Sequence, residues 1–268
     1  MTFDPDVLDE VLELDGPGRL DVWRGIARRP QLRLETAGAS TLTVVCDYVD
    51  HQLPALATSG GTITAAAVGR TWELAAVKRV NGRTVLVFED DVVCALRVPD
   101  MMSVPAGATT VNELATRLTR ARGVRVLLEH TRQTIAGTFA FNGPVWKALG
   151  DLGDHAGRWR YSDGQQLVLA SPAWLLDQPS DVTVVEDEDG YGQVDYDLHA
   201  NKPLATAAAG HVGDAPVVGI AHRLEVDGPA GGDWLVGSYS VSLGDDDGRI
   251  TWVRPAPQAP IGRPYPWS

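Results

Sequence analysis

The 268-residue sequence is poor in several kinds of residue on which whole classes of protein depend. It has two cysteines, Cys46 and Cys94, which excludes a disulfide scaffold, and we expect both to be buried apolar positions. Basic residues number 23 against 35 acidic ones, so the charge of −12 disfavours tight DNA binding. No apolar run reaches the ~18 residues of a membrane-spanning helix. The acidic start of the chain, MTFDPDVLDEV, shows no secretory signal.

The motifs of common catalytic and metal centres are also missing. The histidines are scattered without the His-x-x-x-His or Cys-x-x-Cys spacing of metal ligands, at His51, His130, His155, His199, His211 and His222. There is no Gly-x-Ser-x-Gly nucleophile motif, and GYGQVD at 190–195 is too short for a dinucleotide loop. We therefore expect no catalytic, cofactor-binding or metal-binding residues, no cofactor and no enzymatic activity.

One acid-rich stretch, VVEDEDGYGQVDYDLH at 184–199, is a candidate for chemistry. An EF-hand calcium loop fails at both ends, where Val185 and Tyr196 replace the required acids. A glycosidase needs two carboxylates, one with its pKa raised by an apolar pocket, and no pocket is evident around the available acids, which are Glu186, Asp187, Glu188, Asp195 and Asp197. We favour a solvated hairpin turn at Gly190, followed by a strand in which Val194, Tyr196 and Leu198 alternate.

Most of the chain has the alternation of apolar and polar residues typical of β-strands. STLTVVCDYVD and GTITAAAVG are rich in threonine and valine, and Val80-Asn81-Gly82-Arg83 is a strong hairpin signal between two further strands. The strand pattern resumes after Ser180. Near the N-terminus, DPDVLDEVLEL predicts a short helix capped by Asp4.

Between 101 and 179 the pattern changes to a small α/β unit. Thr110 and Glu113 form a capping box at the start of a helix that Gly123 ends. A second helix is expected with Pro144 in its first turn, and a hairpin is expected at Asp163-Gly164. This unit interrupts two stretches of β pattern.

The two β stretches resemble each other. RTWELAAVKRVNGRTVLVFED and GDWLVGSYSVSLGDDDGRITWVRP each hold a tryptophan, an apolar strand, a turn ending in Gly-Arg and a return strand. This suggests two β units of similar build. The tryptophans fall at apolar positions, where we expect core packing, namely Trp72, Trp146, Trp159, Trp174, Trp234 and Trp252.

The order of these segments resembles the tail hub proteins of long-tailed phages, particularly the minor tail proteins of phages that infect actinobacteria. The resemblance runs from Ser40 to Pro257, over STLTVVCDYVDHQL, WELAAVKRVNGRTVLVFED, NGPVWKALGDLGDHAGRWRYSDGQQLVLASPAWLL, and GDWLVGSYSVSL with ITWVRPAPQAP. Gly244 stands where relatives often have phenylalanine. Many relatives continue into peptidoglycan-cleaving domains, and this sequence stops instead.

The resemblance implies a mainly β fold in which two tube-like β-barrel domains flank a small α/β domain, as in baseplate hubs of T-even phages and type VI secretion spikes. The implied divisions are an N-terminal extension with the first barrel (1–100), an α/β insert (101–179), a second barrel (180–256) and a proline-rich tail (257–268).

The resemblance also implies a homotrimer at the virion tail tip, assembled in the host cytoplasm. Its implied partners are the distal tail protein ring, the tape measure protein, tail fibre or tip proteins, and passing DNA without sequence-specific binding. The alternative is an envelope-directed protein that binds or cleaves glycans with the clustered carboxylates.

Overall fold

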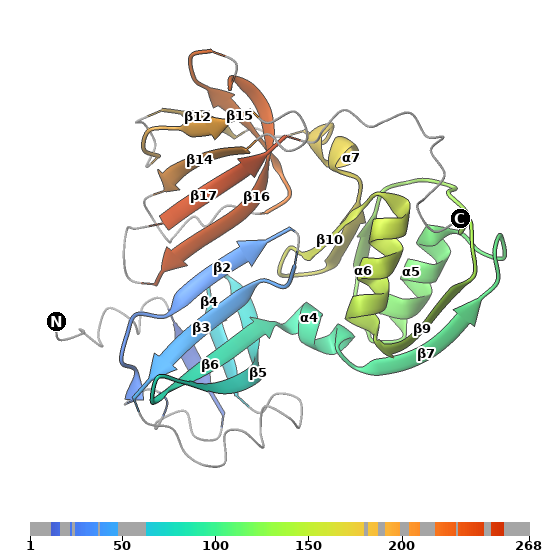
Figure 1. Ribbon diagram of the computed structural model, residues 1–268, viewed down its shortest axis with the longest axis horizontal. Helices are drawn as coiled ribbons and strands as arrows, with labels where there is room; N and C mark the ends of the chain where they lie inside the picture. The colour runs from blue at the N-terminus through green and yellow to red at the C-terminus, as the bar shows by residue number, and fades with distance from the viewer. Residues whose placement is uncertain are drawn as a thin grey trace.

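A computed structural model describes residues 12–16, 22, 25–36, 38–47, 63–179, 182–186, 191–198, 204–209, 218–228, 230–243 and 248–254 (Figure 1). The turn at Gly190, the proline-rich tail and most of the helix expected over 4–14 lie outside these residues. The end of that expected helix is wrong, because Glu13 and Leu14 belong to a β-strand. Within them, no helix combines the length and apolar character needed to cross a bilayer.

The first set of strands comes from the N-terminal part of the chain. Its order in the sheet is β1-β4-β5-β6-β3-β2. The strands are β1 (Glu13–Asp15), β2 (Gln31–Glu35), β3 (Thr41–Cys46), β4 (Thr64–Ala67), β5 (Arg70–Val80) and β6 (Arg83–Asp90).

The second set comes from the C-terminal part and repeats that order, as β12-β15-β16-β17-β14-β13. Its strands are β12 (Thr183–Val185), β13 (Asp195–Asp197), β14 (Leu204–Ala209), β15 (Ala221–Glu225), β16 (Gly232–Ser242) and β17 (Gly248–Val253). If the six strands of each set are renumbered 1 to 6 in chain order, both sets have the sheet order 1-4-5-6-3-2. The one difference in direction is that β1 pairs antiparallel with β4, whereas β12 pairs parallel with β15.

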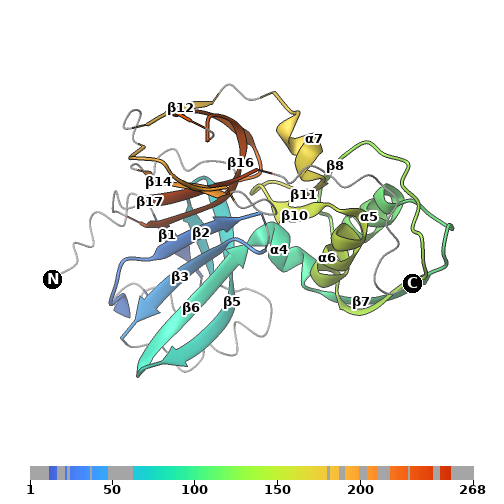
Figure 2. The same ribbon diagram turned by 45° about the horizontal axis from the view of Figure 1, so that its top comes forward.

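The two sets join into a single 12-stranded sheet because β16 pairs with β2. The first half of β16 pairs with β15, and its second half pairs with β2, so one strand belongs to both sets. Figures 1 and 2 show that the joined sheet is strongly curled, like half of a barrel. The prediction of a mainly β fold is confirmed.

The repeat extends to the details of one hairpin in each set. β5 and β16 are both 11 residues long, and each carries a tryptophan at its third position, Trp72 and Trp234, fully buried. The register shifts two residues later in both hairpins, after Leu74 and after Val236. Each indole N–H donates to a backbone carbonyl just before the strand, at 3.2 and 2.8 Å. The β5–β6 and β16–β17 hairpins are therefore more alike in structure than in sequence.

The predicted hairpin at Val80–Arg83 is confirmed. β5 and β6 pair up to Val80 and Arg83, and the two turn residues between them have positive φ angles, 50° for Asn81 and 80° for Gly82. These angles are typical of a type I′ turn, which matches the twist of paired strands and favours Asn-Gly.

The segment between the two sets holds the helices whose bounds the described residues give. Its helices are α4 (Asp91–Leu96), α5 (Val111–Arg120), α6 (Val145–Ala156) and α7 (Pro172–Leu176), and its strands are β7 (Pro99–Val104), β8 (Val126–Leu128), β9 (Phe139–Pro144), β10 (Trp159–Ser162) and β11 (Leu167–Ala170). The Thr110–Glu113 capping box on α5 and the β10–β11 hairpin are both confirmed. Pro144 caps α6 rather than lying in its first turn.

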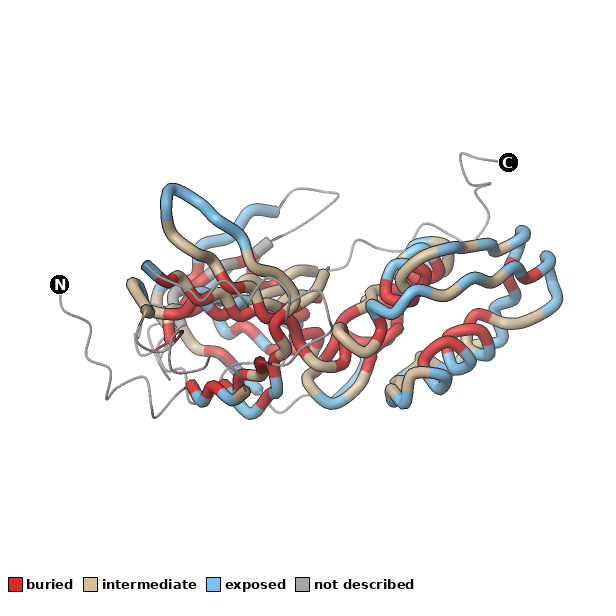
Figure 3. The backbone as a smooth tube through the Cα atoms, turned by 90° about the horizontal axis from the view of Figure 1, so that it is seen from below, coloured by how far each residue is buried: buried red, intermediate tan, exposed pale blue. Residues whose placement is uncertain are grey.

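Two buried clusters support the fold, and β11 lies between them. Leu167 and Leu169 pack into the cluster under α5 and α6, while Val168 and Ala170 pack into the main cluster of the curled sheet. Successive side chains of a strand point to opposite faces, so one strand contributes to both clusters. Figure 3 shows buried residues both in the sheet and in the helical part.

The tryptophan prediction is confirmed in part. Trp72, Trp234 and Trp252 are fully buried and Trp146 is nearly so, whereas Trp159 and Trp174 are partly buried at the edge of the main cluster.

We expect both cysteine thiols to resist alkylation in the folded protein. Both are free; Cys46 is buried and Cys94 partly buried, and burial raises the pKa of each thiol to about 12. At pH 8 very little of either is the reactive thiolate. Ellman's reagent should therefore report close to zero thiols in the native state and two in denaturant. Rapid labelling of native protein would contradict this expectation.

Candidate functional site

The acids singled out in the sequence do not form a paired site. The Glu186 carboxylate accepts a hydrogen bond from the Val194 amide at 2.9 Å, and Asp195 and Asp197 are exposed on β13. Asp187 and Glu188 lie outside the described residues. The expected hairpin is wrong, because β12 pairs with β15 and β13 pairs with β14 instead of with each other. Val194 is buried, but Tyr196 and Leu198 are exposed.

The histidines that the structure describes do not gather either. His130 is exposed, His155 lies in the last turn of α6, and His222 is buried against Trp252. Among the described residues, no group of three or more His, Cys, Asp or Glu side chains could hold a metal ion. His51, His199 and His211 lie outside that part of the chain.

His222 should make stability depend on pH. Burial lowers its pKa from 6.5 to about 4, and its Nδ1 accepts a hydrogen bond from the Trp252 indole at 3.3 Å. The unfolded chain takes up a proton below pH 6.5 and the folded chain only near pH 4. The free energy of unfolding should therefore fall by up to ~3 kcal/mol as the pH drops between these values.

Urea unfolding from pH 7.5 to 4 would measure this slope. Because carboxylates also titrate at the acid end, the test is the difference between the wild type and His222→Asn, which keeps an acceptor for Trp252. Equal slopes in the two proteins would contradict the assignment to His222.

A buried polar cluster that the sequence did not suggest lies where the first strand set meets the helical segment. The Arg70 guanidinium donates to Asp90 Oδ2 and to the Ser162 carbonyl, both at 3.3 Å. Ser162 Oγ donates to Asp90 Oδ1 at 2.8 Å, and the Val92 amide donates to the same oxygen at 3.1 Å. Asp90 also caps α4.

This cluster joins two parts of the molecule. Burial raises the pKa of Asp90 and lowers that of Arg70, while their mutual attraction acts in the opposite direction on both. Arg70 and Asp90 come from the strand set and Ser162 from β10, so their hydrogen bonds hold β10 against the sheet. A second close approach lies nearby, because a Cβ on Gly219 would come within 2.0 Å of the Tyr161 hydroxyl.

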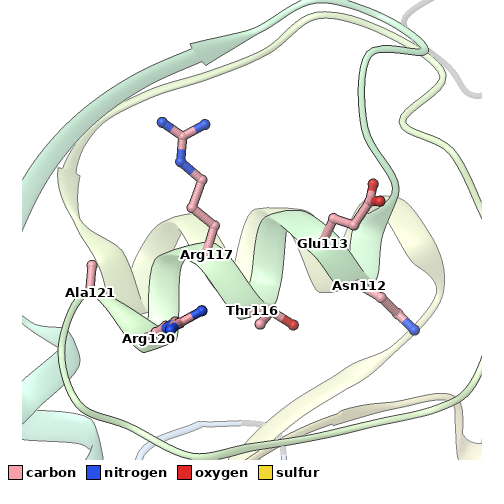
Figure 4. A pocket seen from close by; sticks show the side chains of 6 residues that line it. All are labelled: Asn112, Glu113, Thr116, Arg117, Arg120 and Ala121. Atoms are coloured by element: carbon pink, nitrogen blue, oxygen red, sulfur yellow. The ribbon is translucent and has the colours of Figure 1, made fainter.

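One groove runs along α5 and has a volume of about 630 Å³. Figure 4 shows Glu113 and Arg117 extending to one side of the helix and Asn112 and Arg120 to the other. Glu113 is its one carboxylate, and it accepts three hydrogen bonds from Thr109 and Thr110, which lower its pKa. The groove therefore holds no acid–base pair.

The ends of the curled sheet are the remaining candidate. Among the described strands, β1, β12 and β13 each pair with one strand only, and each is three residues long. β1 and β13 each carry two acids, in Glu-Leu-Asp and Asp-Tyr-Asp. Short, charged edge strands resist non-specific strand addition but leave backbone groups for a matched partner.

No protein-family model matches the chain, and no curated protein matches its sequence. Solved structures do match. The 43 kDa tail protein of prophage MuSo2 from Shewanella oneidensis has a TM-score of 0.61 at 12% identity, covering 92% of this chain and 99% of the other. A tail protein from Neisseria meningitidis has a TM-score of 0.57 at 11% identity, covering 91% and 95%.

A third match is a component of the E. coli type VI secretion system that is described as similar in structure to the T4 bacteriophage tail proteins gp27 and gp5. Its TM-score is 0.59 at 11% identity, covering 94% of this chain and 79% of the other. At these identities the matches establish the fold, which is that of phage tail proteins along nearly the whole chain.

Proposed function

We propose that the protein is a structural hub of a phage tail tip or baseplate, without enzymatic activity. It would form a trimeric ring that ends the tail tube. The narrower family suggested by the sequence, the hub proteins of phages that infect actinobacteria, is part of this proposal.

The observation that carries the proposal is the repeated strand order, 1-4-5-6-3-2 in each of two six-stranded sets. We infer that each set forms one tube-like barrel domain in the assembly, at 1–100 and 180–256, with the α/β domain at 101–179 between them and the proline-rich tail at 257–268. Three chains with two similar units each supply six units. Such a ring has approximate sixfold symmetry toward a tail tube and threefold symmetry toward the tip.

This ring would join the distal tail protein ring to the tip, contact the tape measure protein and carry tail fibre or tip proteins. DNA would pass through its lumen during ejection. The charge of −12 per chain suits that role, because like charge reduces adhesion of a moving duplex. The site of action would be the virion tail tip, after assembly in the host cytoplasm.

Electron microscopy of the purified chain tests the proposal. We expect ring-shaped particles with the mass of three chains and two strand sets per chain around the opening. A monodisperse monomer that binds or cleaves cell-wall glycans would overturn it in favour of the envelope-directed alternative.

A further inference from the structure

The pairing of β16 with β2, which joins the two strand sets, is called the seam below. The equivalent strands of the two sets do not form such a pair within one copy. Residues Ser238–Ser242 of β16, the fifth strand of the second set in chain order, pair with β2, the second strand of the first set. The corresponding strands are β5 in the first set and β13 in the second. Beyond its pairing with β4 at Arg70–Glu73, β5 pairs with no described strand except β6, and β13 pairs with no described strand except β14.

The registers of the two sets fix which residues correspond. Positions in β16 are 162 higher than their counterparts in β5, so Ser238–Ser242 corresponds to Ala76–Val80. The same correspondence can be carried across each set from one paired residue to the next. In the first set, Leu74 leads through β6 and β3 to Leu32 of β2, and in the second set its counterpart Val236 leads through β17 and β14 to Tyr196 of β13. Leu32 therefore corresponds to Tyr196, and Leu34 to Leu198.

Burial and charge both support a missing partner at these strands. Leu32 and Leu34, on the strand that pairs with β16, are 1% exposed and belong to the main buried cluster, whereas Tyr196 is 47% and Leu198 39% exposed. In β5, Lys78, Arg79 and Val80 are exposed as well. The two strands have opposite charge, with two basic residues on β5 and two aspartates on β13.

We propose that β13 of one copy pairs antiparallel with Ala76–Val80 of β5 in a second copy, which repeats between chains the seam that β2 and β16 make within one. In this register Val80 lies opposite Asp195, Arg79 opposite Tyr196, and Lys78 opposite Asp197. The seam adds Tyr196 and Leu198 to the buried surface and brings opposite charges together across the strands. It rests on the proposed function, since it supplies the contact between chains of the ring.

The symmetry of the seam follows from its two different sides. Each copy contributes β5 to one neighbour and β13 to the other, so the contact is head-to-tail, and a head-to-tail contact that closes gives a ring. A two-fold dimer through β13 alone would instead place aspartates against aspartates.

Disulfide trapping tests the pairing and its polarity. Lys78→Cys and Asp197→Cys are made in separate chains. The native thiols of Cys46 and Cys94, whose pKa values burial raises to about 12, serve as an unreactive background. Under mild oxidation we expect disulfide-linked dimers when the two proteins are mixed, and little from either alone. Asp177→Cys, an exposed aspartate beyond α7, is the matched control and should not link to Lys78→Cys. Equal linking by the control, or no linking in the mixture, would overturn the pairing.

Charge exchange with electron microscopy separates this inference from the proposed function. Lys78→Glu/Arg79→Glu and Asp195→Lys/Asp197→Lys should each stop ring formation, and their mixture should restore it. Rings that persist in every variant would overturn the seam and leave the hub intact. A wild-type monomer without rings would overturn both.

Discussion

Replacing Asp90 by alanine is expected to lower the free energy of unfolding by about 3–5 kcal/mol, the typical cost of removing one partner of a buried ion pair. Arg70 is 8% exposed and Asp90 is fully buried. Without Asp90 the guanidinium would lose its carboxylate, Ser162 Oγ its acceptor and α4 its cap. Urea denaturation followed by tryptophan fluorescence measures the loss.

Two further variants show whether burial is the cause. Asp100→Ala removes a partner of Arg122 from a more exposed ion pair and should cost less than about 1 kcal/mol. Arg70→Met/Asp90→Leu removes both charges and should recover much of the stability lost in Asp90→Ala. An Asp90→Ala protein as stable as Asp100→Ala would show that the buried cluster contributes little.

Truncating either repeated tryptophan, by Trp72→Ala or Trp234→Ala, should cost about 3–5 kcal/mol, because each leaves a large cavity in the core of its strand set. Tail assembly should fail with it. Both side chains are fully buried, and Arg254 also stacks over the Trp234 ring at 4.2 Å. Thermal and urea unfolding of the purified variants would measure the loss.

Replacing each tryptophan by phenylalanine separates the contribution of apolar packing to stability from that of the indole hydrogen bond. Trp72→Phe and Trp234→Phe keep most of the apolar contact but lose the indole N–H, and each leaves one backbone carbonyl, of Ala67 or Ala230, without that donor. We expect a cost of about 1–2 kcal/mol for each. Wild-type stability in the alanine variants would contradict the core assignment of these residues.

Local signals in the sequence were enough for the parts of the fold that depend on near neighbours. The Asn81-Gly82 turn, the capping box of α5 and the β10–β11 hairpin are each encoded within a few residues, and each is present. The resemblance between the two tryptophan hairpins was visible too, although the repeated strand order was not, because it depends on pairings between distant segments.

The failures have the same cause. The stretch at 184–199 has the composition of a turn between paired strands, but its two strands pair with β15 and β14, which come later in the chain. The Arg70–Asp90–Ser162 cluster spans 92 positions, and no spacing rule connects its members. Tyr196 and Leu198 follow the alternation of a strand with one buried face, and within a single copy neither is buried.

The position of β11 between the two buried clusters has a consequence for how the protein unfolds. Leu167 and Leu169 belong to one cluster, and Val168 and Ala170 to the other, so neither cluster can be lost without stripping one face of the same strand. Separate domains joined by a linker melt independently, whereas parts that share a strand lose structure together. We therefore expect the α/β segment and the curled sheet to unfold as one cooperative unit, with a single transition for both.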